Sequence, residues 1–146
     1  MENGFSTQIW SSENTIINNR LFSKLLKPVD YFSLDGTLYR IPAYQPTDYA
    51  STPPEVWGAP FFLIPYGWYC LSVAGHDSAY QNLLLVVHMD GSVTLANLTE
   101  EKSNALLLEM MQSLKPQPTL EEKAQMDEIY RGVTIGGWHA YKEDRS

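Results

Sequence analysis

The stretch GWYCLSVAGHDSAYQ, residues 67–81, is patterned as a helix and stands between a long proline-rich segment and a segment with β patterning. Residues spaced by three and four fall on one face of a helix, and four side chains of the stretch share such a stripe: Cys70, Val73, Asp77 and Tyr80. The first half of the predicted helix is apolar, and its second half brings His76, Asp77 and Tyr80 together. We therefore expect this helix to carry the best candidate for a functional site.

Turn signals divide the segments on either side of this helix into hairpins. Within residues 28–42, apolar and polar side chains alternate on both sides of Asp35-Gly36, and glycine accepts the positive φ that a tight hairpin turn requires. Residues 83–96 repeat the pattern around Asp90-Gly91. Both segments therefore predict β-hairpins, one before the helix and one after it.

A second helix is expected over residues 99–114. Asn97 or Thr99 would be its N-cap, because both side chains can accept a hydrogen bond from the first turn. Its apolar positions are those expected of a buried helix face: Leu106, Leu107, Met110, Met111 and Leu114.

A capping box begins the third helix. Thr119 can accept from the amide of Glu122, whose carboxylate can reach back to the amide of Thr119. We expect this helix to stop at Gly136-Gly137, since glycine is common just beyond helix ends.

The predicted architecture is α+β, with a core of three helices, one β-hairpin before helix 1 and another between helices 1 and 2. The length of 146 residues suits one domain. We divide the chain into an N-terminal arm (1–20), a single α+β domain (21–141) and a charged tail (142–146). A short strand around Phe5 is the alternative to a loosely tied arm.

Composition limits the classes of partner. The net charge is −7 and the ten Lys and Arg residues are scattered, so neither nucleic acid nor an anionic membrane surface is expected as a partner. No apolar stretch is long enough for a membrane span. Cys70 is the only cysteine, so the fold does not depend on an internal disulfide. The N-terminus lacks the pattern of a secretory signal peptide.

A long loop precedes the first helix. Residues 43–66 hold five of the nine prolines and little periodicity, and their Thr47-Asp48, Ser51 and Trp57 are candidate anchors. Loops of this length are commonly functional or disordered, and the aromatic and proline content favours an ordered loop.

Four motifs in this order resemble a known family. They are TDYASTP at 47–53 with Trp57, GHDSAY at 75–80, SNALLLEMM at 103–111 and IYRGVTIGGW at 129–138. Together they resemble the phage- and prophage-associated domain-of-unknown-function family numbered 1353, over roughly residues 27–138. The resemblance implies a phage or prophage origin, and hence the host cytoplasm or the virion as location, but no established activity. This chain departs from the family pattern at Asn104, where Asp is usual, and at Tyr49, where Gly is usual.

The His-Asp-x-x-Tyr helix is also similar to the active helix of secreted phospholipases of the A-two class. That similarity implies a general-base role for His76, a calcium-binding role for Asp77 and an orienting role for Tyr80. Histidine suits base catalysis because its ordinary pKa lies near neutral pH. Those lipases rely on disulfides, however, and this chain has one cysteine.

A divalent metal is a separate hypothesis, and no cofactor is predicted beyond it. Asp48, His76, Asp77 and Asn104 offer the oxygen and imidazole ligands that such ions use. His76 and Asp77 are adjacent, so on a helix they point about 100° apart and need a bend or a water to share one ion.

Two functions remain open. The first is a phage accessory protein that binds a virion or host protein, with Ser51, Trp57, Asn104 and Trp138 as candidate binding residues. The second is a hydrolase with His76 as base, assisted by Asp48, Asp77 and Tyr80. The bland alternative for the same residues is a hydrogen-bond network that holds the long loop against the core, because buried polar groups need partners.

Overall fold

The structure is a computed structural model that describes residues 2–7, 12–17, 20–25, 27–43, 46–47 and 68–145. Three helices follow one another in the C-terminal half: α1 (Cys70–Tyr80), α2 (Glu100–Leu114) and α3 (Leu120–Arg145). The strands are β1 (Gly4–Phe5), β2 (Ser12–Ile17), β3 (Arg20–Leu25), β4 (Val29–Phe32), β5 (Leu38–Ile41), β6 (Pro46–Thr47), β7 (Leu85–Val87) and β8 (Val93–Leu95). The α+β class, with hairpins before α1 and between α1 and α2, is confirmed.

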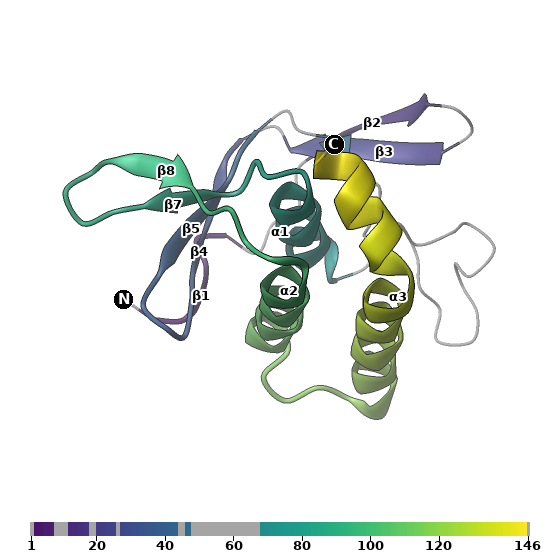
Figure 1. Ribbon diagram of the computed structural model, residues 1–146. Helices are drawn as coiled ribbons and strands as arrows, with labels where there is room; N and C mark the ends of the chain where they lie inside the picture. Colours follow the sequence, from purple (N-terminus) through teal and green to yellow (C-terminus); the bar gives the residue numbers. More distant parts are fainter. Residues whose placement is uncertain are drawn as a thin grey trace.

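The strands form two antiparallel sheets. The larger has the order β1-β4-β5-β7-β8, and the smaller has the order β2-β3-β6. The second hairpin thus extends the sheet that the first one begins, because β7 pairs with β5. In Figure 1 the helices lie on one side of the larger sheet, with α3 beyond α1 and α2.

Both predicted hairpin turns are present. Gly36 has a φ of +90° and Gly91 a φ of +87°, the left-handed region that glycine enters without steric cost. Register follows: Tyr31 lies opposite Tyr39, and Val86 opposite Thr94. Pairing of this kind puts alternate side chains on one face, as expected for a half-buried strand.

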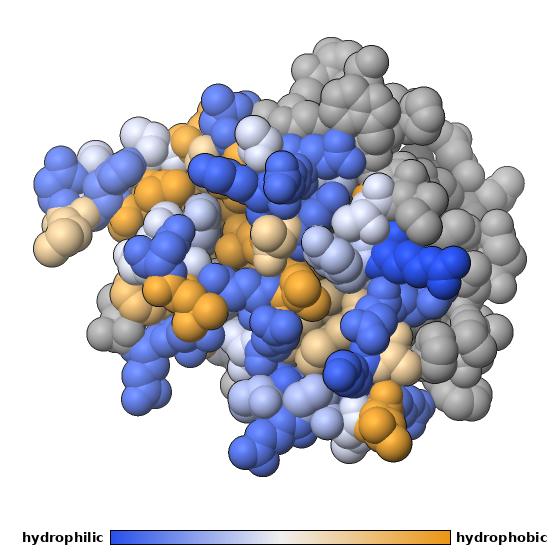
Figure 2. Space-filling model, turned by 60° about the horizontal axis from the view of Figure 1, so that its bottom comes forward, coloured by the Kyte–Doolittle hydropathy of each residue, from blue (hydrophilic) through white to orange (hydrophobic). Residues whose placement is uncertain are grey.

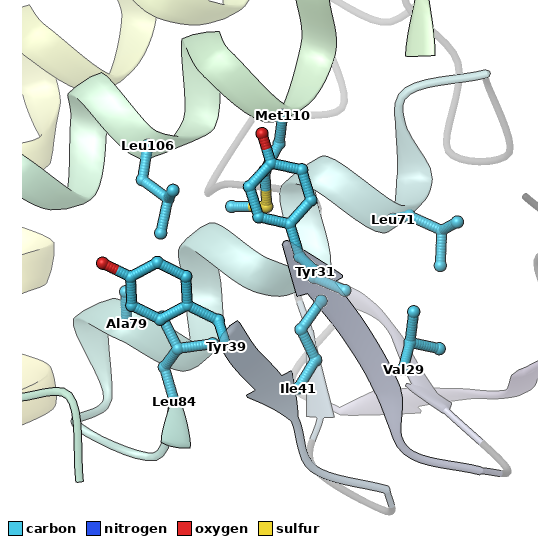
Figure 3. Packing of buried hydrophobic residues seen from close by; sticks show 10 residues of the cluster. Val29, Tyr31, Tyr39, Ile41, Leu71, Ala79, Leu84, Leu106 and Met110 are labelled. Carbon is cyan, nitrogen blue, oxygen red and sulfur yellow. The ribbon is translucent and has the colours of Figure 1, made fainter. Parts of the chain in front are cut away.

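Two apolar clusters enclose α1. The first fills the space between the larger sheet and the helices, where Tyr31, Ile41 and Met110 are each at most 1% exposed; Figure 3 shows the sheet side chains meeting those of α2. The second joins the three helices around Leu107 and Met111, both fully buried. Because α1 has a cluster on either side, every residue from Cys70 to Tyr80 is buried.

The expected division of α1 into an apolar and a polar half therefore does not lead to an exposed polar end.

Close packing also explains why residue 75 of α1 is a glycine. A Cβ at this position would lie 2.8 Å from Cε and 2.9 Å from Sδ of Met110, and 3.3 Å from Cδ1 of Ile41. Glycine here lets α1 approach α2 and β5 together.

The helix caps agree with the sequence. Thr99 is the N-cap of α2, and its side chain accepts from the amide of Lys102 at 3.2 Å. Before α3, the amide of Glu122 donates to Oγ1 of Thr119 at 3.1 Å and the amide of Thr119 donates to Oε1 of Glu122 at 2.9 Å. Both bonds of the predicted capping box are thus formed.

The predicted end of the third helix is wrong. α3 continues through Gly136-Gly137 and ends at Arg145, so it includes most of the expected charged tail. Glycine inside a helix costs only about 1 kcal/mol relative to alanine, which does not by itself stop a helix. No helix in the described part of the chain is long and apolar enough to cross a membrane.

The N-terminal region contains structure that the sequence pattern did not predict. β2 and β3 pair along their full length from Ser12↔Leu25 to Ile17↔Arg20, and β3 also pairs with β6. At the very start, the short-strand alternative holds for Gly4–Phe5, which pairs with β4. The proline-rich loop over residues 48–66 lies outside the described residues.

Candidate functional site

His76, Tyr80 and Asn104 form one buried hydrogen-bond network. Oδ1 of Asn104 lies 2.8 Å from Nε2 of His76 and 2.8 Å from the hydroxyl of Tyr80, which donates to it. The two rings lie one helical turn apart on α1, with centroids 4.1 Å apart and planes tilted by 44°. A single amide oxygen of α2 therefore holds two side chains of α1.

The acceptor fixes the tautomer of His76. An amide oxygen accepts hydrogen bonds and cannot donate, so Nε2 of His76 carries the proton in this arrangement. Nδ1 then carries the lone pair, and it has no hydrogen-bond partner among the described residues. Oδ1 of Asp77 is 3.8 Å from Nδ1, beyond hydrogen-bond distance.

The network is sealed from solvent. His76 is 1% exposed, Tyr80 3%, Asn104 5% and Asp77 6%. A general base must come within hydrogen-bond reach of the proton that it removes. In this tautomer Nδ1 is the ring nitrogen that could accept a proton. It is buried in the interior of the fold.

A metal site is not assembled from the described residues. Among them, no three side chains of His, Cys, Asp or Glu are placed to hold an ion together. The sequence hypothesis placed Asp48 in the ligand set, and Asp48 lies outside the described residues, as do Ser51 and Trp57. Its neighbour Thr47 ends β6, and β6 does contact α1. Trp138 belongs to α3, of which only the backbone is described at that position.

A second network, centred on Glu109, was missed at the level of sequence. Oε2 of Glu109 accepts from the hydroxyl of Tyr31 at 2.6 Å, and both carboxylate oxygens lie 3.1 Å from the donating hydroxyl of Ser33. The amide of Leu34 also donates to Oε1 at 3.4 Å. Glu109 thus ties α2 to the β4–β5 hairpin. The spacing of Val29, Tyr31 and Ser33 on one face was the available signal.

Burial and the carboxylate of Glu109 both affect Tyr31. Burial is the larger cause, and with the adjacent carboxylate it raises the pKa of Tyr31 well above its usual value. The phenol therefore stays protonated and remains a donor. Asn3 donates from Nδ2 to the same hydroxyl at 3.0 Å and to the carbonyl of Phe32 at 2.8 Å, so β1 joins this network.

Cys70 is a buried thiol of α1. Its side chain is 2% exposed, and burial raises the pKa of its thiol to about 12. The thiolate is the reactive form of cysteine, so a thiol that keeps its proton in the interior is inert. Cys70 packs as a small residue of the second apolar cluster.

The second cluster is closed at its edge by polar contacts. Trp68 donates from Nε1 to Oε1 of Gln125 at 2.8 Å, and Nζ of Lys115 lies 5.8 Å from the centre of the Trp68 ring. Lys115 also pairs with Glu122 at 2.8 Å. These contacts join the α2–α3 turn to the segment before α1.

Comparison of the whole chain with family models, curated proteins and solved structures gave no match.

Proposed function

We propose that this chain is a non-enzymatic binding protein in which the His76 network braces the fold. The observation that supports this proposal most strongly is the burial of His76 to 1% exposure, with its Nε2–H donating a hydrogen bond to Oδ1 of Asn104. A ring fixed in this way by α2 holds two helices in register. Nδ1 of His76 is itself buried, which disfavours contact with a substrate in the folded chain.

The candidate binding surface lies on the other side of the larger sheet. Val29, Tyr31, Tyr39 and Ile41 face the helices, so alternate residues face away from them. Register places two rows on this outer face: Phe32, Leu38, Val87 and Val93 in one, and Asp30, Arg40, Leu85 and Leu95 in the other.

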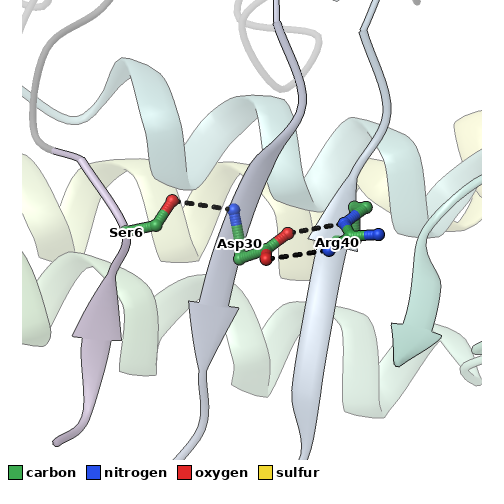
Figure 4. Close-up of polar contacts among 3 residues, drawn as sticks. All are labelled: Ser6, Asp30 and Arg40. Atoms are coloured by element: carbon green, nitrogen blue, oxygen red, sulfur yellow. Dashed lines mark hydrogen bonds and ion pairs between the residues drawn. The ribbon is translucent and has the colours of Figure 1, made fainter. Parts of the chain in front are cut away.

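Most of these outer-face side chains are apolar. Six of the eight are Phe, Leu or Val, and Val93 and Leu95 are 44% and 51% exposed. The polar pair is an ion pair, with Arg40 donating to both oxygens of Asp30 at 2.8 and 3.1 Å (Figure 4). An apolar surface rimmed by an ion pair is typical of a protein-binding site.

On the face in Figure 2, hydrophobic side chains form small patches separated by hydrophilic ones. The outer face is continuous across four neighbouring strands, which favours it as the place where a protein partner binds. The resemblance to a phage-associated family suggests a virion component or a host protein as that partner, in the virion or the host cytoplasm.

Histidine labelling tests whether His76 is accessible. Diethyl pyrocarbonate modifies solvent-accessible imidazoles, and peptide mass spectrometry reports each site. His88 is exposed and serves as the internal control. We expect His88 to be modified in the folded protein and His76 only after unfolding. Modification of His76 at the rate of His88 would instead support the hydrolase alternative.

A pair of variants separates bracing from binding in the parent phage or prophage. His76→Ala should lower the unfolding temperature and the function together, because it removes part of the brace. Leu38→Ser on the outer face should reduce function with a smaller loss of stability. A His76→Ala protein of unchanged stability and no function would contradict the proposal, because that result marks a working site.

A further inference from the structure

β8 is the last strand of the larger sheet, and no strand pairs with its outer edge among the described residues. Every residue of β8 is exposed, and Met89 at the preceding turn is fully exposed. Figure 1 shows the β7–β8 hairpin at the margin of the sheet, away from α3. Natural edge strands are commonly blunted by short length, lysine, proline or a bulge, and β8 is short, with three residues. Val93-Thr94-Leu95 has none of these residues.

The hydrogen-bond pattern tells which backbone groups point outward. The amide of His88 donates to the carbonyl of Ser92, and the amide of Ala96 donates to the carbonyl of Leu84. Hydrogen-bonded pairs alternate with non-bonded pairs in an antiparallel ladder, so Thr94 bonds to β7. The amides and carbonyls of Val93 and Leu95 therefore face the open edge.

We propose that β8 pairs with β8 of a second copy of this chain, antiparallel and about a two-fold axis at Thr94. In that register Val93 lies opposite Leu95 of the other copy, and each pair exchanges two hydrogen bonds. All four outward backbone groups of each strand are satisfied. The result is one continuous sheet of ten strands, formed from the five strands of each copy.

Side chains support the same register. Val93 and Leu95 share the outer face, so the pairing places apolar side chains beside each other across the join. The apolar rows of the two outer faces then become continuous. This inference rests on backbone register and does not depend on the proposed function.

Charge favours this edge over the rest of the surface. Each copy has a net charge of −7, so two copies repel each other on average. Residues 91–99 contain no charged side chain. The β8 edge is therefore a place where two copies can approach with little like-charge repulsion, and its exposed residues Ser92, Val93, Thr94 and Leu95 are apolar or hydroxylic.

A cysteine placed on the axis tests the register directly. Directly opposite residues of a non-hydrogen-bonded pair have Cα atoms about 4.5 Å apart, within the range that a disulfide spans. Thr94→Cys should therefore give a covalent dimer of twice 16.6 kDa under mild oxidation. The native Cys70 is 2% exposed and should not take part.

Val93→Cys is the matched control. Two copies of residue 93 would be displaced by two positions along each strand, with Cα atoms about 8 Å apart, too far for a disulfide. We expect at least a tenfold lower yield of covalent dimer than from Thr94→Cys. Adding Leu95→Lys to Thr94→Cys should reduce the yield to the control level, because it brings positive charges together at the join.

Light scattering on the native chain completes the experiment. We expect its mass to rise toward twice 16.6 kDa with concentration, and Leu95→Lys to stay monomeric while retaining its circular dichroism spectrum. A native chain that is monomeric throughout, together with no covalent dimer from Thr94→Cys, would overturn the proposal. Equal yields from Thr94→Cys and Val93→Cys would also overturn it, since random collision produces that result.

Discussion

Two acceptors on α2, Asn104 and Glu109, each gather hydrogen bonds from other elements, and they do so in different surroundings. Asn104 is 5% exposed, neutral, and accepts from His76 and Tyr80 on α1. Glu109 is a half-buried carboxylate that accepts from the β4–β5 hairpin. One acceptor fixes a helix to a helix, and the other fixes a helix to the sheet.

The difference shows that two acceptors with unlike sequence contexts can hold elements together in the same way. The His-Asp-x-x-Tyr pattern indicates chemistry because histidine and aspartate are common in active sites, whereas Glu109 stands among apolar residues and carries no such signal. In the folded chain both acceptors have the same kind of role. They satisfy buried donors, and a donor left without a partner in such a place costs about 1–3 kcal/mol.

The largest effect is expected when Asn104 loses its oxygen. Asn104→Leu keeps the volume of the side chain but leaves Nε2 of His76 and the hydroxyl of Tyr80 without their shared acceptor. The free energy of unfolding should fall by about 4 kcal/mol, from two orphaned buried donors. Chemical denaturation measures it, and Lys102→Ala on the exposed side of α2 is the control, with a change below about 0.5 kcal/mol.

Replacing Glu109 should have a smaller effect. Glu109→Ala removes the acceptor of Tyr31, Ser33 and Leu34, but water can reach part of this site. A loss of about 2–3 kcal/mol follows from hydrogen bonds to a charged group, and Glu109→Gln should recover part of it. If Glu109→Ala destabilises the chain more than Asn104→Leu does, the ranking of the two networks is wrong.

The close packing of Gly75 against Met110 gives the next prediction. Gly75→Ala places a methyl group 2.8 Å from Cε of Met110, and Met110 is itself 1% exposed. Overpacking of this kind should cost about 2 kcal/mol in the free energy of unfolding. Met110→Val in the same chain should offset part of that cost, since it shortens the clashing side chain. A stabilising Gly75→Ala would show that α1 and α2 are farther apart.

The smallest effect concerns pH and the first residue of α1. The thiol of Cys70 has its pKa raised by burial from 9.0 to about 12, so the unfolded chain releases this proton at lower pH than the folded chain does. Stability from this group is fully present below pH 9 and is lost as the pH rises toward 12. By pH 10 the loss is about 1.4 kcal/mol. Denaturation of Cys70→Ala over the same pH range should lack this part of the slope.

The parts of the fold that were predictable are those with local signals. The turns at Asp35-Gly36 and Asp90-Gly91 require particular backbone angles, and Thr119 with Glu122 forms a cap within four residues. Each of these structures is determined by residues that are neighbours in the sequence. The end of α3 was not predictable from Gly136-Gly137, because glycine lowers helix propensity without forbidding the helix. β2 and β3 lack strong alternation, so their pairing could not be anticipated.

For the candidate site, the sequence predicted which residues come together but not how deeply they are buried. The sequence brought His76, Tyr80 and Asn104 into one hypothesis, and the structure places these three in contact. Their burial was not predictable, because it depends on two apolar clusters built from residues far apart in the chain. The periodicity of α1 also predicted a single buried face, whereas the sheet on one side and the other helices on the other bury the whole helix.

A double-mutant cycle between His76 and Asn104 tests the central claim most directly. The free energy of unfolding is measured for the native chain, His76→Phe, Asn104→Leu and the double variant. If the pair is a structural brace, the double variant should be more stable than the sum of the single losses implies, by about 1–3 kcal/mol, because it removes donor and acceptor together. Losses that add to within about 0.5 kcal/mol would show that the two side chains are not coupled, and would contradict the claim.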